Sequence, residues 1–395
     1  MEKDGIISRK KFLYQTGVLG AAAVVAPAIL SKGEVPSVQK KIRVGVIGCG
    51  SVSTQYLPHL SKSPFVELAS TCDIIPQRAI DAASKYGISN HYDSIEKMLS
   101  GVPFDLLVNL TDMQEHGRLN KLAISAGRNV WSEKPMATTY QEGKALLDLA
   151  KQKGVRIWGA PAVVNSPQFA FMAKAINDNK LGKIAAAHAH YGHPGPGWSA
   201  FFYEKNGGSM PDLAVYNMAS LTGLLGPVKS IVAMLNIITP TRKVDNRPQP
   251  IKVEAEDNSM VLMEHQSGAL SHVQSGFNYY DPYGHGGVGQ DKPTISIWGK
   301  TGNMHLIGYD WAPAAVDMAN EEQNERTVRY AEDAGKYVWQ EGASVIAEYL
   351  ATGKEPSINA EHSLHVLEII EGARKSQDTG TRIQLKSTFP WPVVK

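Results

Sequence analysis

Short β-branched runs alternate with amphipathic stretches through the first half of the chain. The apolar runs KIRVGVIG, VELASTCD, DLLVNLT, NVWSEKP and VRIWGAP begin at residues 41, 66, 105, 129 and 155. Between them lie segments such as IPQRAIDAASKYG and TTYQEGKALLDLAKQKG, in which apolar residues recur at the three- and four-residue spacing of a helix. Repetition of strand, helix and strand predicts a doubly wound parallel sheet with covered faces, of α/β class, over residues 40–160.

The rhythm changes after residue 161. A helix is expected at 167–182 and another at 212–226, and longer alternating runs at 183–193, 228–238, 258–278 and 294–308 predict strands. The pair Ser267 and Gly268 stands between two such runs and is typical of a hairpin turn. Two further helical patterns, at 338–353 and 362–376, close the chain. We therefore expect residues 161–395 to form an α+β domain with a large, mainly antiparallel open sheet.

The first 32 residues resemble an export leader. Positive residues precede an apolar run from Val18 to Leu30, and the small-residue pattern at 26–28 suits a signal peptidase. The stretch SRKKFL is close to a twin-arginine motif in which Lys10 replaces the second arginine. These features predict an exported, periplasmic protein without a membrane anchor after processing. The alternative is a cytoplasmic protein in which this segment is an uncleaved helix.

Charge and cysteine content exclude several classes. Lys and Arg number 40 against 38 Asp and Glu, and no dense basic stripe occurs, so nucleic acid is a poor partner. The two cysteines, Cys49 and Cys72, make neither a disulfide framework nor a zinc set.

A small-residue turn at 48–53, GCGSVS, follows the first strand and opens a helix. Such a turn lets the backbone approach a pyrophosphate closely. Asp73 ends the next strand, where its carboxylate could bind both ribose hydroxyls and repel a 2′-phosphate. NAD is thus favoured over NADP, unless Arg78 offsets that charge; the alternative is a βαβ unit that binds no dinucleotide. The expected cofactor contacts from this part of the chain are Gly48, Gly50, Ser51, Val52, Asp73 and Arg78.

Two stretches carry a family resemblance. DLLVNLTDMQEHG, from residue 105, and AISAGRNVWSEKPMA, from residue 123, resemble the Gfo/Idh/MocA family of sugar and cyclitol oxidoreductases. The resemblance implies that 133–135 is the signature Glu-Lys-Pro, with Lys134 at the nicotinamide and the substrate hydroxyl. It also implies cofactor contacts at Leu110, Thr111, His116 and Glu133.

A third stretch, GGSMPDLAVYNMASLTGLLGPV from residue 207, is similar to the family's glycine-rich entry to a helix. Asp212 holds the family's aspartate position and Tyr216 the position of a usual histidine, and a spacing of four places both on one helix face. The resemblance implies that Lys134 and Tyr216 handle the hydroxyl proton, with Asp212 orienting or charging them. Which of the two is the base stays open, and we expect the Lys134 ammonium to lower the pKa of Tyr216. Alternatively, Tyr216 only packs under the sheet and Asp212 only caps its helix.

Histidines and aromatic residues cluster between 188 and 203. His188, His190 and His193 lack a carboxylate partner set at ligand spacing, so no metal is expected. Aromatic faces stack on sugar rings while polar tips bind hydroxyls, which predicts a sugar pocket. Its expected lining is His190, His193, Trp198 and Tyr203, with Tyr279, Tyr280 and Tyr283 as possible extensions. The family resemblance adds Asn165 as a further polar candidate, the residue left where the family has an Asn-x-Arg segment.

These patterns together predict an NAD-dependent oxidoreductase that takes a hydride from a ring hydroxyl of a sugar, glycoside or cyclitol. Export in the folded state would require tightly bound NAD. The alternatives are an NAD-dependent glycosidase or lyase acting by transient oxidation and elimination, and a non-catalytic sugar or nucleotide sensor. By analogy with the family, the C-terminal sheet is the expected face of a homo-oligomer.

Overall fold

The computed structural model describes residues 40–280, 292–324 and 326–394. The predicted leader and Tyr283 lie outside these ranges. No described helix is both long enough and apolar enough to cross a membrane.

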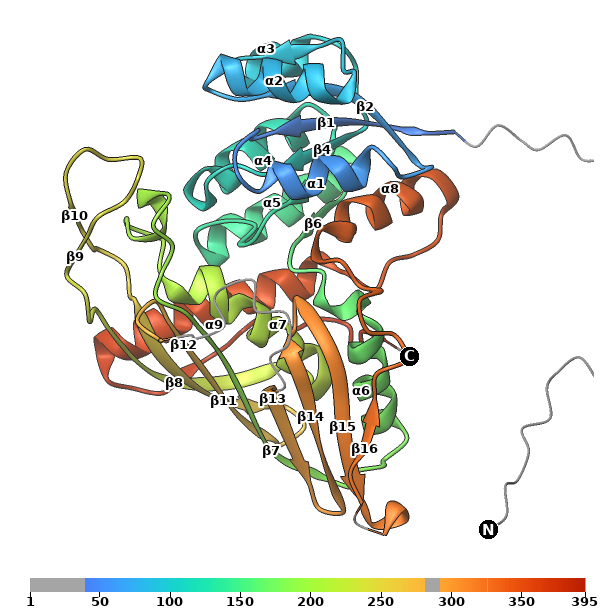
Figure 1. Ribbon diagram of the computed structural model, residues 1–395, viewed down its shortest axis with the longest axis vertical. Helices are drawn as coiled ribbons and strands as arrows, with labels where there is room; N and C mark the ends of the chain where they lie inside the picture. Colours follow the sequence, from blue (N-terminus) through green and yellow to red (C-terminus); the bar gives the residue numbers. More distant parts are fainter. Residues whose placement is uncertain (1–39, 281–291, 325, 395) are drawn as a thin grey trace, which may run out of the picture. The chain divides into compact units, whose positions relative to one another are not determined.

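A six-stranded sheet forms the first half of the described chain (Figure 1), in the order β3-β2-β1-β4-β5-β6 with every pair parallel. This is the strand order of dinucleotide-binding doubly wound folds. The central strands are buried on both faces, which explains their continuous apolar runs. The predicted parallel sheet is confirmed. Its strands are β1 Ile42–Ile47, β2 Val66–Cys72, β3 His91–Tyr92, β4 Leu106–Asn109, β5 Asn129–Ser132 and β6 Ile157–Gly159.

Helices connect these strands, and capping residues mark where several of them begin and end. The Ser94 and Thr139 side chains cap the helices α3 and α5 by accepting backbone N–H bonds. Gly87 and Gly154 end α2 and α5 in the left-handed conformation. The helices are α1 Ser53–Leu60, α2 Pro76–Tyr86, α3 Ile95–Ser100, α4 His116–Ser125 and α5 Tyr140–Lys153.

A nine-stranded sheet forms the second half, in the order β16-β15-β14-β13-β7-β12-β11-β8-β17. Every pairing is antiparallel except that of β12 with β7. The predicted mainly antiparallel sheet is therefore confirmed, and Gly268 turns the β11–β12 hairpin at φ 89°. Its strands are β7 Ile184–Gly192, β8 Val228–Asn236, β11 Asn258–His265, β12 Leu270–Gly276, β13 Pro293–Gly299, β14 Gly302–Tyr309, β15 Ala312–Asn320, β16 Val328–Tyr330 and β17 Ile383–Gln384.

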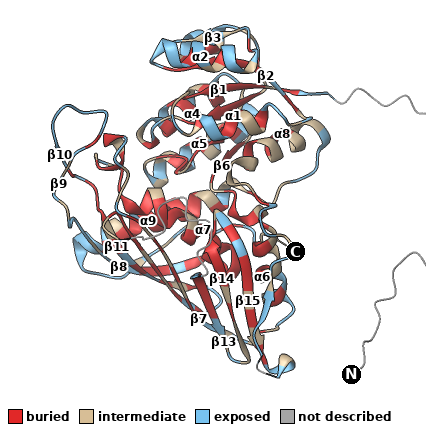
Figure 2. Cartoon of the chain, viewed as in Figure 1, coloured by how far each residue is buried: buried red, intermediate tan, exposed pale blue. Residues whose placement is uncertain are grey.

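Helices α6, α7 and α9 cover one face of this sheet, and α8 and α9 join the second half to the first. Helix α9 packs on β8 and also on α5, and α8 packs on β1 and β5, so two late segments bind the two sheets into one body (Figure 1). The opposite face of the nine-stranded sheet is left with exposed residues (Figure 2). The helices are α6 Pro167–Asn177, α7 Val215–Leu225, α8 Gly342–Thr352 and α9 Ala360–Thr379; β9 Thr241–Arg242 and β10 Ile251–Lys252 form a separate small hairpin.

Candidate active site

A cavity of about 670 Å³ is lined by residues of both halves. The first half contributes the turns that follow β1, β4 and β5, where the carboxyl ends of parallel strands meet. The second half contributes the end of β7, the loop after it and the start of α7. The lining includes eleven of the predicted site residues: Ser51, Val52, Leu110, Thr111, His116, Glu133, Lys134, His193, Trp198, Asp212 and Tyr216.

The turn after β1 leaves no room for a side chain at its first glycine. Gly48 has φ +89°, and a Cβ there would lie 2.6 Å from the carbonyl carbon and oxygen of Leu110. A Cβ on Gly50 would meet only Arg78 Nη1, at 3.8 Å, so the space above Gly50 is open. A tight turn with an open backbone surface fits the pyrophosphate of a dinucleotide.

Asp73 stands beside this turn at the end of β2. Its buried carboxylate accepts hydrogen bonds from the backbone N–H groups of Cys49 and Ile75, both at 2.8 Å. The carboxylate therefore fixes the turn and places negative charge at the strand end, where a ribose would bind. Arg78 is exposed on α2.

Glu133 is held by two donors at the end of β5. Its Oε1 accepts the Tyr56 hydroxyl at 2.7 Å and its Oε2 accepts the Lys134 backbone N–H at 2.9 Å. Trp131 Nε1 donates in turn to the Tyr56 oxygen at 3.2 Å. Tyr56, on α1, was not predicted. The one sequence signal for it was its position on the side of the first helix that faces the core, just after the glycine turn.

His116 joins the turns after β4 and β5. Its Nδ1 lies 2.7 Å from the Pro135 carbonyl oxygen and its Nε2 lies 2.9 Å from that of Thr111. Burial lowers the pKa of this imidazole. Since both nitrogens face backbone carbonyls, His116 shapes the wall of the cavity and positions the segment that carries Lys134.

Lys134 and Asp212 form an ion pair on the cavity wall. The ammonium donates to Asp212 Oδ1 at 2.7 Å and to the Asp212 backbone carbonyl at 2.8 Å, and the side chains are 11% and 13% exposed. Asp212 lies in a π-helical turn, Met210–Ala214, that leads into α7. Its side chain makes no helix-capping bond, so the capping alternative does not hold.

Tyr216 lies beside this pair. The Lys134 ammonium stands 5.2 Å from the centre of the Tyr216 ring. Burial raises the pKa of Tyr216 well above its ordinary value, and the charges of Glu133, Tyr191 and Asp212 act in the same direction. The expectation of a lowered tyrosine pKa is corrected: desolvation and nearby carboxylates outweigh the ammonium. Tyr216 is thus a neutral phenol at neutral pH.

Three predicted substrate residues do not line the cavity. His190 alternates with Tyr191 on β7, so its ring points to the outer face, where it stacks on His188 at 5.8 Å. Tyr203 is buried, and its hydroxyl donates to the Pro196 carbonyl at 2.8 Å. Asn165 lies in a short turn that packs against α6 and α7. The prediction of direct pocket contacts for these three residues is corrected.

Tyr279 and Tyr280, suggested as extensions of the pocket, do not line the cavity. Tyr279 packs over Gly192 and Gly276 and hydrogen-bonds Gln274 and Asn258, while Tyr280 is exposed. Within the described residues, no three His, Cys, Asp or Glu side chains are grouped to hold a metal ion.

Several lining residues were not predicted. Gln55, Met113 and Leu213 lie inside or beside the recognised motifs, and most of the others come from the loop after β7, the β14–β15 turn and the approach to α8. Tyr191, at the end of β7, required only the opposite phase of strand alternation. The lining residues that were not predicted include Gln55, Met113, Tyr191, Phe201, Phe202, Leu213, Trp311 and Trp339.

Two family models match the chain. Residues 42–160 match the oxidoreductase family with an NAD-binding Rossmann fold, and residues 169–305 match the GFO/IDH/MocA C-terminal domain. The chain belongs to the Gfo/Idh/MocA family. It is therefore an NAD-dependent oxidoreductase whose first half is the NAD-binding domain. The tight turn at Gly48 and the open backbone at Gly50 agree with this.

Relatives in the Gfo/Idh/MocA family act on sugars and inositols. The chain is 25% identical over 250 residues to D-glucoside 3-dehydrogenase of Escherichia coli, covering 60% of this chain and 70% of that protein. It is 23% identical over 248 residues to the NAD⁺-dependent scyllo-inositol 2-dehydrogenase of Bacillus subtilis, covering 62% and 70%. The structure of levoglucosan dehydrogenase with NADH and L-sorbose is similar in fold, with a TM-score of 0.74, 19% identity and coverage of 88% and 100%.

Proposed function

We propose that this protein oxidises a ring hydroxyl of a sugar, glycoside or cyclitol. The observation that carries the proposal is the Lys134–Asp212 ion pair, which faces one cavity together with the dinucleotide turn and a wall of aromatic side chains. When bound, NAD supplies the acceptor for the hydride that leaves the ring carbon. The protein has to supply a base that accepts the hydroxyl proton and a positive charge that stabilises the negative charge developing on the oxygen.

Lys134 is the group proposed to meet the substrate hydroxyl. Its ammonium stabilises negative charge on the substrate oxygen, and Asp212 accepts its hydrogen bond at 2.7 Å. As the free amine, Lys134 accepts the hydroxyl proton, and the Asp212 carboxylate stabilises the ammonium that forms. Tyr216, a neutral phenol, orients the same oxygen by hydrogen bonding.

The remaining walls suit a neutral ring. Tyr191, Trp311 and Trp339 offer aromatic faces, and His193 adds a polar group. Apolar ring faces stack on such walls, while polar groups select the hydroxyl pattern. This inner part of the cavity is where the oxidised ring would lie.

The test is Lys134→Ala, compared with Lys144→Ala. Lys144 is an exposed lysine of α5 that pairs with Asp148. We expect kcat/KM for a sugar or glycoside to fall by roughly 10²–10⁴-fold in Lys134→Ala, as for loss of an acid–base group, and to remain unchanged in the control. NAD retained by the purified variant should also be quantified, to separate lost chemistry from lost cofactor.

Three outcomes would contradict this assignment. Unchanged turnover in Lys134→Ala removes the proposed base. Release of an aglycone without net NADH indicates the elimination reaction. Binding of sugars without any turnover across a broad panel indicates a sensor.

A further inference from the structure

An aromatic shelf forms the outer part of the same cavity. We define the outer shelf as Pro194, Gly195, Pro196, Trp198, Phe201 and Phe202, all of which line the cavity. Trp198 is 42% exposed, whereas the Lys134 side chain at the chemical centre is 11% exposed. Trp198 and Pro194 are thus the solvent-exposed part of the shelf, while Phe202 is buried. The exposed part lies farther toward solvent than the place proposed for the oxidised ring.

The three aromatic rings of the outer shelf pack against one another. Trp198 lies edge-on to Phe201 and Phe202, with ring centres 5.4 and 4.8 Å apart, and the two phenylalanine rings are 4.0 Å apart. Gln114 Nε2 of the first half donates to the Phe201 carbonyl at 2.8 Å. These contacts hold an indole at the mouth of the cavity at little further cost in conformational entropy.

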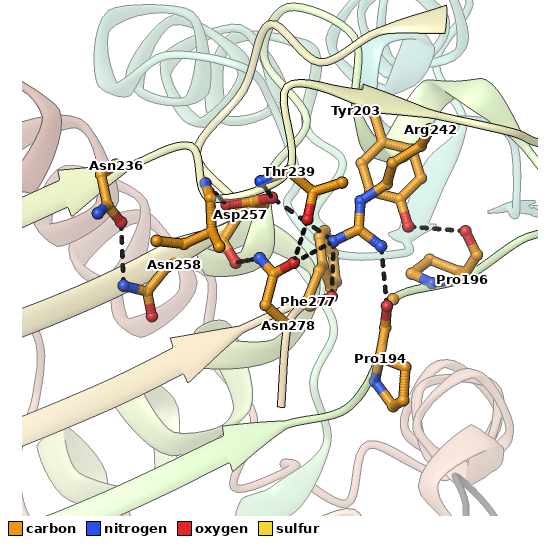
Figure 3. Close-up of polar contacts among 12 residues, drawn as sticks. Pro194, Pro196, Tyr203, Asn236, Thr239, Arg242, Asp257, Asn258, Phe277 and Asn278 are labelled. Carbon is orange, nitrogen blue, oxygen red and sulfur yellow. Dashed lines mark hydrogen bonds and ion pairs between the residues drawn. The ribbon is translucent and has the colours of Figure 1, made fainter. Parts of the chain in front are cut away.

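Arg242 and Tyr203 hold the backbone of the outer shelf by hydrogen bonds (Figure 3). Arg242 Nη1 donates to the Pro194 carbonyl at 2.8 Å, and the Tyr203 hydroxyl donates to the Pro196 carbonyl at 2.8 Å. The guanidinium lies 4.9 Å from the centre of the Tyr203 ring. Gly195, at φ +96°, is required here because a Cβ would come within 2.5 Å of Arg242 Nη1 and 2.6 Å of the Tyr203 oxygen.

Arg242 is itself fixed by a buried network. Its Nη2 donates to the Phe277 carbonyl and to Asn278 Oδ1, both at 2.7 Å (Figure 3). The fully buried Asp257 carboxylate lies 3.5 Å from the same nitrogen and accepts the backbone N–H groups of Ile238 and Thr239. The arginine is thus committed to the shelf and is not available as a ligand for an anion.

The charge of the lining selects the ligand class. Among the described residues, Lys134 is the one Lys or Arg that lines the cavity, and it is paired with Asp212. A diphosphate needs cationic or helix-terminal donors, which this shelf does not offer. A neutral ring with an apolar face suits stacked and edge-on aromatic side chains.

We propose that the outer shelf is a binding subsite for a neutral ring attached to the oxidised sugar, either an aryl aglycone or a second pyranose. This inference rests on the proposed function and names its substrate class as a glycoside rather than a free monosaccharide or a nucleotide sugar. Trp198 is the contact surface, and Arg242 is a positioning residue that holds the loop.

The experiment compares methyl glucoside, phenyl glucoside, a neutral glucose disaccharide and uridine diphosphoglucose on the NAD-loaded protein. We expect kcat/KM for the phenyl glucoside or the disaccharide to exceed that for the methyl glucoside by roughly tenfold, the factor that one well-placed aromatic contact provides. The better of the two identifies the source of the ring. Preference for the nucleotide sugar overturns the proposal.

Two variants and a matched control assign the preference to the shelf. Trp198→Ala should bring the ratio of phenyl to methyl kcat/KM close to one. Trp298→Ala, equally exposed at 42% but on β13, should keep the wild-type ratio. Arg242→Lys should lower the same ratio by raising KM for the phenyl glucoside. A lysine cannot donate to the Pro194 and Phe277 carbonyls at the same time in the fixed geometry of a guanidinium.

Dissociation constants of the two glucosides, measured by calorimetry with NADH bound, separate this proposal from the proposed function. Tighter binding of the phenyl glucoside that is lost in Trp198→Ala, without turnover, supports the subsite and contradicts the oxidoreductase assignment on glycosides. Turnover with equal constants for both glucosides supports that assignment and overturns the subsite.

Discussion

Glu133 owes its orientation to a residue on another element. The Tyr56 hydroxyl donates to its Oε1 at 2.7 Å and also accepts from Trp131 at 3.2 Å, so one phenol bridges α1 and β5. Burial raises the pKa of Tyr56 well above its ordinary value, and the neighbouring Glu133 charge adds to the effect. Tyr56 therefore stays protonated and remains a donor, which fixes the carboxylate beside the cofactor turn.

The prediction at this scale is that Tyr56→Phe weakens both stability and cofactor binding. The change removes the hydroxyl that donates to Glu133 Oε1 and accepts from Trp131 Nε1, and both atoms remain buried. We expect this to lower the free energy of unfolding by about 1–3 kcal/mol. We expect a lower urea midpoint and a several-fold higher dissociation constant for NADH, measured by fluorescence titration.

Tyr86→Phe is the control, because Tyr86 is half-buried on α2 and takes no part in this network. A Tyr56→Phe protein with wild-type NADH affinity would show that Glu133 needs no such support.

At the scale of elements, α9 holds the sheet and helix α7 together through buried histidines. His365 Nε2 accepts the Val228 N–H at 2.9 Å, and His362 Nε2 lies 2.7 Å from Thr222 Oγ1. Burial lowers the pKa of His365 to about 4 and that of His362 to about 3. Both imidazoles are therefore neutral in the folded protein at neutral pH.

This arrangement predicts acid lability between pH 6.5 and 4. Because the folded pKa lies below the unfolded one, the unfolded chain binds more protons in this window, and stability falls as pH falls. For His365 alone, a shift from 6.5 to about 4 corresponds to about 3 kcal/mol at about 1.4 kcal/mol per pKa unit. Urea unfolding at a series of pH values measures the slope.

The variant that assigns this slope is His365→Gln, in which the amide oxygen can still accept the Val228 N–H. We expect a lower stability at pH 7 and a flatter decline toward pH 4 than in the wild type. His91→Gln, on the exposed strand β3, should keep the wild-type slope. An equal slope in His365→Gln and the wild type would refute the assignment.

On the scale of the whole molecule, the outer face of the nine-stranded sheet remains uncovered among the described residues. Exposed apolar side chains of neighbouring strands stand opposite each other there, Leu262 beside Val232 and Met260 beside Met234. A contiguous apolar patch of this kind marks an interaction surface. A second copy carries the same flat patch, and a two-fold axis would bring the two together.

We therefore predict that Leu262→Glu combined with Met260→Glu yields a smaller species than the wild type in sedimentation velocity. The two like charges would have to be buried without partners at the interface. Ile80→Glu, which changes an exposed apolar residue of α2, should leave the assembly intact. A wild-type monomer, or an unchanged oligomer in the double variant, would contradict this interface. Export through the leader stays a prediction.

The sequence by itself determined the features that depend on local pattern. The parallel, doubly wound sheet follows from alternation of strand and helix, the dinucleotide turn from small residues between them, and the candidate residues Lys134, Asp212 and Tyr216 from short motifs. Their meeting at one site was implied by the family resemblance, and in the structure all three line the same cavity.

Only the tertiary structure decided the rest, because it depends on contacts between residues distant in sequence. In β7 the flanking alanines leave the phase of alternation open, and packing against α7 turns Tyr191 rather than His190 inward. The pKa of Tyr216 rises because burial and carboxylates from other elements outweigh the one cation that sequence reasoning considered. Arg242 and Tyr56 act through carbonyl and carboxylate partners supplied by other segments, and no spacing along the chain encodes such bonds.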